Sequence, residues 1–199
     1  MPEIAKTKES AKNPIRCHWC LNDPLYIKYH DEEWGQPVHD DKKLFEFLIL
    51  ESFQAGLSWL TILKKRENFR QAFAGFEVKK VAQFDEQKIQ TLMLDAGIIR
   101  NQLKIRAAVN NAQRFIEIQK EFGSFSNYVW QFVGNKPQIN AIVKPGDIKP
   151  TSAISDAMSK DMGKRGFKFR GSTICYAFMQ AMGLVDDHLN TCHKKTKRR

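Results

Sequence analysis

The chain has 199 residues, of which 42% are hydrophobic, and it carries a formal net charge of +10 at pH 7. This size suits one globular domain, or two small lobes that share a core. No segment is long and apolar enough to cross a membrane, and the first residues lack the apolar run of a secretory signal, so we expect a cytoplasmic protein. The excess of Lys and Arg indicates a polyanionic partner, of which nucleic acid is the usual one.

Polar and basic residues mark both ends of the chain. Residues 1–15 are predicted to be a disordered basic extension, and residues 194–199 (KKTKRR) a basic tail. Lysines also occur across the body between these ends. The body shows neither an internal repeat nor a low-complexity linker.

Apolar residues recur at helical spacing through most of the body. Residues 137–150 carry Pro137, Pro145 and Pro150 and are expected to form a loop. Thr151 or Ser152 is a suitable N-cap for the helix that follows, and Gly183 should end the last helix. Strand-like alternation is scarce, so the predicted class is all-α. Helices are predicted at about residues 44–51, 60–73, 78–84, 87–94, 101–122, 153–162 and 172–182.

A short segment, Asp95-Ala96-Gly97-Ile98-Ile99-Arg100, separates two of the predicted helices. A helix, a tight turn with glycine and a second helix form the layout of a helix-hairpin-helix. We expect Gly97 to let the backbone turn sharply, so that amides near the start of the second helix can hold a phosphate. An ordinary helix corner capped by glycine is the alternative.

The chain has four cysteines, Cys17, Cys20, Cys175 and Cys192. In a cytosolic protein they are metal ligands or buried thiols rather than disulfides. His188 and Cys192 are four residues apart, so on a helix they share one face and suit one tetrahedral zinc. Cys17 and His30 could complete that site and clasp the two ends of the chain together. Buried cysteines with exposed histidines are the alternative to any metal site, and the rival ligands are Cys20, His18 and His193.

Aromatic residues gather in the sequence around one acid, Glu51. This acid ends a strongly apolar run, residues 44–50, where a charge is costly unless it has a partner. A buried carboxylate beside aromatic rings can hydrogen-bond the edge of a nucleic acid base while the rings stack on its faces. A glutamate turned to solvent at a helix end is the alternative. The aromatic residues concerned are Trp19, Tyr26, Tyr29, Trp34 and Trp59.

Several blocks of the chain, in order, resemble the 3-methyladenine DNA glycosylase I family. The resemblance covers residues 16–193, and it implies a single glycosylase domain of two helical lobes with a helix-hairpin-helix fold and a structural zinc. Two features depart from the family pattern: the two ends of the chain lie beyond it, and Phe53 stands where the family often has a polar residue. The matching blocks are residues 16–17, 23–27, 29–31, 33–35, 54–59, 63–67, 95–100, 164–169, 173–176 and 187–188.

The resemblance also implies roles for individual residues. Glu51 matches the acid that hydrogen-bonds the flipped base, and Gly56 and Leu57 match a loop that approaches the gap left in the duplex. The DNA-contacting hairpin would be Gly97, Ile98, Ile99 and Arg100. The base-binding rings would be Tyr26, Tyr29, Trp59 and Trp19. The ligands of one Zn²⁺ would be Cys17, His30, His188 and Cys192.

The implied activity is base-excision repair: a monomeric enzyme that flips 3-methyladenine out of double-stranded DNA and releases it by hydrolysis. N3-methylated adenine is a cation, so it leaves as a neutral base and needs no general acid, unlike the leaving groups of most glycosidases. Electron-rich rings favour a cationic base, and Glu51 can read adenine and stabilise its charge. The hairpin has no lysine for a Schiff base, so no lyase activity is expected.

Two other functions share many of these features. A non-catalytic zinc-containing DNA-binding module would explain the charge, the hairpin and the metal ligands, but it would not need an acid among aromatic rings. A glycosylase with a different lesion preference would share every feature above.

Overall fold

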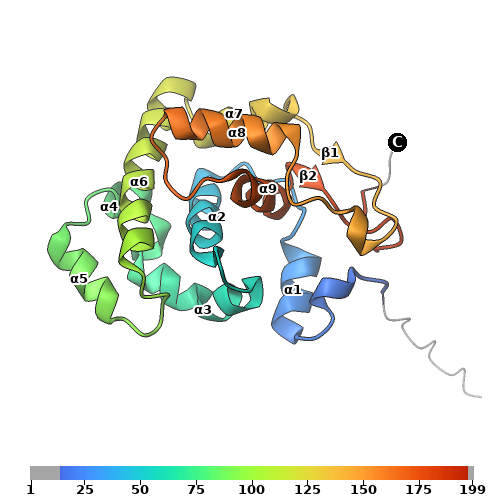
Figure 1. Cartoon of the computed structure of the whole chain (residues 1–199), viewed down its shortest axis with the longest axis horizontal. Coiled ribbons are helices and arrows are strands. Elements are labelled where there is room, and N and C mark those ends of the chain that lie inside the picture. Colours follow the sequence, from blue (N-terminus) through green and yellow to red (C-terminus); the bar gives the residue numbers. More distant parts are fainter. Residues whose placement is uncertain (1–13, 197–199) are drawn as a thin grey trace, which may run out of the picture.

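The computed structural model describes residues 14–196 (Figure 1). Residues 1–13 and 197–199, which hold most of the predicted extension and part of the predicted tail, lie outside the described part. The described chain is predominantly helical, as the all-α prediction requires. Its α-helices are α1 (Pro24–Glu32), α2 (Asp41–Gln54), α3 (Trp59–Ala72), α4 (Val78–Val81), α5 (Glu86–Leu94), α6 (Gln102–Phe122), α7 (Phe125–Trp130), α8 (Ala153–Lys164) and α9 (Ser172–Ala181).

All seven predicted helices are present, with ends that differ by a few residues, and the structure adds α1 and α7. The segment predicted as a loop, 137–150, contains the short strand β1 (Gln138–Ile139). This strand pairs in parallel with β2 (Val185–Asp186), with Gln138 opposite Val185. None of the helices in residues 14–196 is long and apolar enough to span a bilayer.

Helix α2 is the centre of the fold (Figure 1). Every residue from 44 to 53 is buried, and α3, α6, α7 and α9 all pack against it. A helix that is covered on all sides must be apolar on all sides, which explains the run of Leu, Ile and Phe. The same cover buries the few polar side chains of this segment, including Glu51.

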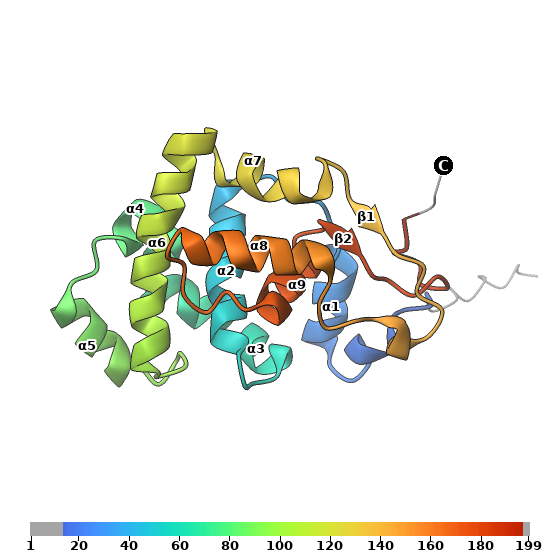
Figure 2. The same cartoon turned by 45° about the horizontal axis from the view of Figure 1, so that its top comes forward.

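The two ends of the described chain lie side by side, at the end of the molecule that carries α1 (Figures 1 and 2). The amide of His193 donates to the carbonyl of Ile15 over 2.9 Å. Lys195 Nζ donates to the Asp186 carbonyl over 3.0 Å, and the Thr196 amide donates to the Asp186 carboxylate over 2.8 Å. The first described residues of the basic tail are therefore fixed against β2.

The segment after α1 passes tightly over the end of α9. The Gly35 amide donates to the Gln180 carbonyl and the Val38 amide to the Met182 carbonyl, over 3.0 and 3.1 Å. Gly183 has φ of +70°, and a Cβ there would lie 2.3 Å from the backbone of Gln36. Only glycine satisfies both conditions, so Gly183 lets the segment after α1 lie directly against the end of α9.

Helices α5 and α6 are joined by the predicted hairpin segment, but Gly97 acts differently from the prediction. Its φ is not positive; the turn forms because Asp95 Oδ1 accepts a hydrogen bond from the Gly97 amide, over 2.7 Å. A Cβ on Gly97 would lie 2.9 Å from that oxygen and 3.1 Å from Asn68 Cβ. Glycine is needed here for close packing against α3, not for a left-handed turn.

A buried ion-pair network ties the end of α1 to α2 and α3. Arg66 on α3 makes two parallel hydrogen bonds to Glu33, of 2.8 and 2.9 Å, and one of 2.6 Å to Glu46 on α2. Burial alone would raise the pKa of Glu33, but hydrogen bonds from Arg66 and Lys43 outweigh it and lower the pKa to about 2. This network fixes the chain directly before Trp34.

Replacing Arg66 by Met tests the network. Arg66 is 8% exposed, and its loss would leave Glu33 with Lys43 alone and the buried Glu46 with Arg70 alone. We expect the free energy of unfolding to fall by about 3 kcal/mol, the lower end of the cost of breaking a buried ion pair. Arg70 shares Glu46, yet its side chain is 39% exposed, so Arg70→Met should cost less than about 1 kcal/mol. Urea denaturation of both variants at pH 7 measures the difference, and equal losses would contradict the role given to burial.

Candidate functional site

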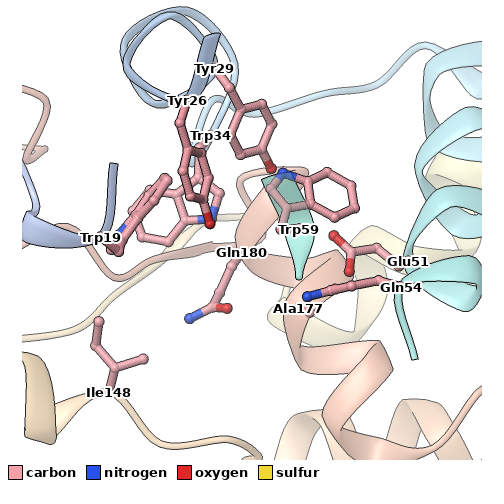
Figure 3. Close-up of a pocket in the computed structure, with 10 residues that line it drawn as sticks. All are labelled: Trp19, Tyr26, Tyr29, Trp34, Glu51, Gln54, Trp59, Ile148, Ala177 and Gln180. Carbon is pink, nitrogen blue, oxygen red and sulfur yellow. The ribbon is translucent and has the colours of Figure 1, made fainter. Parts of the chain in front are cut away.

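A pocket of about 220 Å³ lies between α1, the C-terminal end of α2, the start of α3 and α9 (Figure 3). Four of the residues that line it are the predicted base-binding rings, and a fifth is the predicted acid. The structure therefore brings together residues that are as many as 40 positions apart in the sequence. The lining residues are Trp19, Tyr26, Tyr29, Trp34, Glu51, Gln54, Trp59, Ile148, Ala177 and Gln180.

Glu51 is 3% exposed, and no side chain or amide in residues 14–196 donates a hydrogen bond to its Oε2 atom. Burial without a counter-charge raises the pKa of Glu51 from 4.5 to about 8. The folded protein therefore holds this proton over a pH range in which the unfolded chain has released it. Stability that depends on Glu51 is present below about pH 4.5 and is lost as the pH rises toward 8.

The rings enclose the pocket from the side opposite α9 (Figure 3). The ring centres of Trp19 and Tyr26 are 4.8 Å apart, those of Trp19 and Trp34 are 5.0 Å apart, and those of Tyr29 and Trp59 are 5.5 Å apart. Trp59 Nε1 is buried and has no acceptor in the described chain. The pocket is thus lined by aromatic rings around one carboxyl group that has an unpaired oxygen.

Local sequence explains where these side chains stand. Asp23 caps α1 by accepting from the Leu25 amide, and Pro24 follows at the first helical position. Tyr26 and Tyr29 are three residues apart, so they share one face of this helix. Ser58 caps α3 by accepting from the Thr61 amide, which places Trp59 at the first turn, beside the end of α2.

Sequence reasoning missed five of the lining residues. The sequence places Trp34 among the nearby aromatic residues, two positions after the end of α1, but it predicts no role for this ring. Phe53, where a departure from the family pattern raised a question about the pocket, is fully buried and packs on Phe69 and Phe73, with ring centres 4.8 and 5.7 Å apart. It does not line the pocket. The other missed residues are Gln54, Ile148, Ala177 and Gln180.

A second cluster joins the two ends of the chain. The ligand atoms of Cys17, His30 and Cys192 all lie within 4.8 Å of one another, and Cys192 Sγ is 3.4 Å from His30 Nε2. Burial raises the pKa of Cys17 to about 12, so a thiolate there needs a nearby cation. The structure therefore places three of the four predicted zinc ligands together.

The fourth predicted ligand, His188, lies beside this cluster. Its ring centre is 5.1 Å from that of His30, and its Nε2 atom is buried with no partner in the described chain. The other ring nitrogen, Nδ1, is 3.0 Å from an Asp186 oxygen, just as His30 Nδ1 is 2.7 Å from an Asp31 oxygen. Each carboxylate accepts an N–H, which leaves Nε2 of both histidines as the unprotonated nitrogen.

The prediction that His188 and Cys192 share one face of a helix is wrong, because residues 187–192 are not helical. The segment leaves strand β2, forms a bridge between Ile142 and Leu189, and then turns, with the Cys192 amide donating to the Leu189 carbonyl over 2.8 Å. Among the rival ligands, Cys20 donates from Sγ to the Cys17 carbonyl over 3.1 Å. His18 is exposed. His193 Nε2 pairs with Asp31 over 3.1 Å and joins His30 in a second possible group.

The predicted DNA-contacting residues lie in two exposed turns. Gly56 has φ of +83° and open space around it, and Leu57 is 40% exposed. Their turn connects Gln54 to Trp59, both of which line the pocket, so it stands at the pocket's edge. In the hairpin, Ile98 is buried, Arg100 is exposed, and the amides of Ile99 and Arg100 have no acceptor within residues 14–196.

Known proteins resemble this chain in sequence over most of its length. A sequence model of the methyladenine glycosylase family matches residues 19–195. DNA-3-methyladenine glycosylase 1 of Escherichia coli (strain K12) is 50% identical over 177 residues, which cover 89% of this chain and 95% of that protein. DNA-3-methyladenine glycosylase of Haemophilus influenzae is 48% identical over 181 residues, which cover 91% and 98%.

Solved structures resemble this chain in fold as well as in sequence. A crystal structure of 3-methyladenine DNA glycosylase I has a TM-score of 0.89 and 47% identity, over 92% of this chain and all of that one. A structure that describes 3-methyladenine recognition by the Staphylococcus aureus enzyme has a TM-score of 0.89 and 42% identity, over 92% and 98% of the two chains. The chain therefore belongs to the methyladenine glycosylase family.

Proposed function

We propose that this protein is a DNA-3-methyladenine glycosylase that flips the methylated base out of double-stranded DNA and releases it by hydrolysis. The observation that carries the proposal is a buried, unpaired carboxylate, Glu51, inside a pocket of aromatic rings. A module that only binds DNA has no use for such a pocket, and the relatives named above are glycosylases.

The charge of the lesion explains the composition of the pocket. N3-methyladenine in DNA is a cation, and breaking its bond to the sugar yields a neutral base. A cation over a ring face gains about 0.5–2 kcal/mol for each good contact, and Tyr29 and Trp59 present such faces. The pocket can therefore select the lesion by binding, and the reaction needs no acid to protonate the leaving group.

Glu51 would recognise the adenine edge by hydrogen bonding and balance the positive charge of the methylated base. A protonated Glu51 in the empty pocket can ionise when a cationic base arrives, because an opposite charge at close range lowers the pKa of a carboxyl group. Water attacks the sugar carbon as the base departs. Glu117 and Glu121, the acids of α6, pair with Arg114 and Arg165 over 3.0 and 2.6 Å at exposed positions, so they take no part.

The residues that line the pocket do not include a lysine. An enzyme that also cleaves the DNA strand forms an imine between an amine and the sugar. Lys104, which is buried on α6, donates instead to the carbonyls of Phe53 and Ala55, over 2.9 and 2.6 Å. It supports the turn that carries Gly56 and Leu57, and the proposed enzyme is a glycosylase without lyase activity.

Two exposed turns are proposed to hold the duplex. The free amides of Ile99 and Arg100 at the start of α6 suit a phosphate group, since helix N-termini favour anions. With α5 before the turn and α6 after it, the segment would act as a helix-hairpin-helix. The turn with Gly56 and Leu57, at the pocket's edge, would enter the gap that the flipped nucleotide leaves. The proposed active form is a monomer.

A structural Zn²⁺ is proposed at the second cluster, held by Cys17, His30, His188 and Cys192. Two cysteines and two histidines form a common tetrahedral zinc set. The unpaired Nε2 atom of His188, and the carboxylates that orient both histidines, fit that set better than buried thiols alone. The ion would stabilise two thiolates and hold the two ends of the chain together, with no part in the reaction.

Changing Glu51 to Gln tests the catalytic assignment. Gln keeps the shape but cannot ionise, so release of 3-methyladenine from methylated DNA should fall on the order of 100-fold in kcat/KM, as for other losses of a single charge-stabilising group. The variant should fold normally and bind DNA with an abasic site as the wild type does. Release is followed by chromatography that identifies the free base.

Two results of that assay would contradict the proposal. Wild-type rates in the Gln variant would remove Glu51 from the reaction. Release by the wild type of other alkylated bases, with 3-methyladenine left in the DNA, would keep the enzyme class but overturn the proposed lesion.

Metal analysis tests the zinc proposal. The purified protein should contain about one equivalent of zinc, and Cys192→Ser should lose it together with thermal stability, because binding energy at such a site stabilises the fold. Cys20→Ser is the matched control: this thiol is also buried and is three residues from Cys17, but it should keep the metal. Full occupancy in Cys192→Ser, or loss in Cys20→Ser, would show that the ligand set is wrong.

A further inference from the structure

Gln180 on α9 lines the pocket, and its side-chain amide is held in one orientation. Its Nε2 atom donates to Asp187 Oδ2 over 2.8 Å. A carboxylate only accepts hydrogen bonds, so the amide atom that faces Asp187 must be the nitrogen. The reversed amide, with its oxygen against the carboxylate, would place two acceptors in contact.

Asp187 is held in place by further hydrogen bonds. It is 1% exposed and accepts two more side-chain hydrogen bonds, from the Tyr176 hydroxyl over 2.8 Å and from Asn140 Nδ2 over 2.7 Å. Three donors therefore surround this one buried side chain and satisfy its two oxygen atoms. These hydrogen bonds therefore fix the orientation of the Gln180 amide.

The consequence is that Gln180 Oε1 is left as an acceptor. No donor in residues 14–196 is bonded to it, and the amide projects into the space between Ile148, Ala177 and the rings (Figure 3). Gln54 lines the same pocket, but its side chain has no partner in the described chain, so its amide can turn to present either an N–H or an oxygen. Of the two amides, only that of Gln180 is committed to accept.

We propose that Gln180 Oε1 accepts a hydrogen bond from the exocyclic amine of the bound base, so that Gln180 is a second residue, with Glu51, that selects adenine. The inference rests on the proposed function and adds a specificity residue to it. A purine that carries an oxo group in place of the amine presents a lone pair to Gln180 Oε1. The fixed amide cannot turn to offer its N–H instead. A pocket built to pair with an amine rejects such an analogue because its own polar atoms are left unpaired.

The test compares two ligands in two variants. The ligands are 3-methyladenine and 3-methylpurine, which lacks only the amine, and binding to the full-length protein is followed by tryptophan fluorescence, since three tryptophans line the pocket. Gln180→Met should weaken binding of 3-methyladenine about five- to tenfold, the size of one hydrogen bond. It should leave 3-methylpurine binding within about twofold, which also shows that the pocket is intact.

Gln54→Met is the matched control, because it removes an amide of the same size from the same pocket. It should leave the preference for 3-methyladenine over 3-methylpurine unchanged. An unchanged preference in Gln180→Met, or an equal loss in both variants, would overturn the role of Gln180 while the proposed function stands. If the wild type binds neither ligand, base recognition in the proposed function fails, and this inference fails with it.

Discussion

Glu51 is a carboxyl group that the fold has taken out of water without giving it a counter-charge. It stands near the end of the central helix α2, in a segment buried on all sides, and the residues that line the pocket with it include no charged group. An anion in such a place is unstable by several kcal/mol until a cation arrives. The other features of the pocket follow from this constraint: the rings exclude water, favour a flat cation and leave room for one.

The cluster formed by Cys17, His30, Cys192 and the neighbouring His188 shares a wall with the pocket. Trp34 packs against His188 on one side and Trp19 on the other, with ring centres 4.5 and 5.0 Å apart. Asp187, which orients Gln180, directly precedes His188 in the chain. A clasp between the two ends of the chain therefore also fixes one side of the base pocket. The proposed zinc site would therefore lie directly beside the proposed base pocket.

The sequence predicted most of the helices and the acid, because an unbroken apolar run makes a buried helix and a glutamate inside such a run is conspicuous. It missed α1, although Asp23 followed by Pro24 is a helix start, since only two of its residues, Tyr29 and His30, are buried and the apolar pattern is weak. Gln180 could not be found: nothing local distinguishes it from a surface glutamine, and its role depends on Asp187 across a turn. The reason given for Gly97 was wrong because close packing with α3 is a tertiary effect, invisible in the local pattern.

The ionisation of Glu51 can be measured directly. A ¹³C NMR titration of the glutamate carboxyl groups, with the signal of Glu51 assigned by its absence from Glu51→Gln, measures its pKa. We expect a pKa near 8 in the free protein and a fall when a cationic methylated purine binds, because the bound cation favours the carboxylate. A free-protein pKa near the ordinary glutamate value of 4.5, unchanged by the ligand, would contradict this expectation.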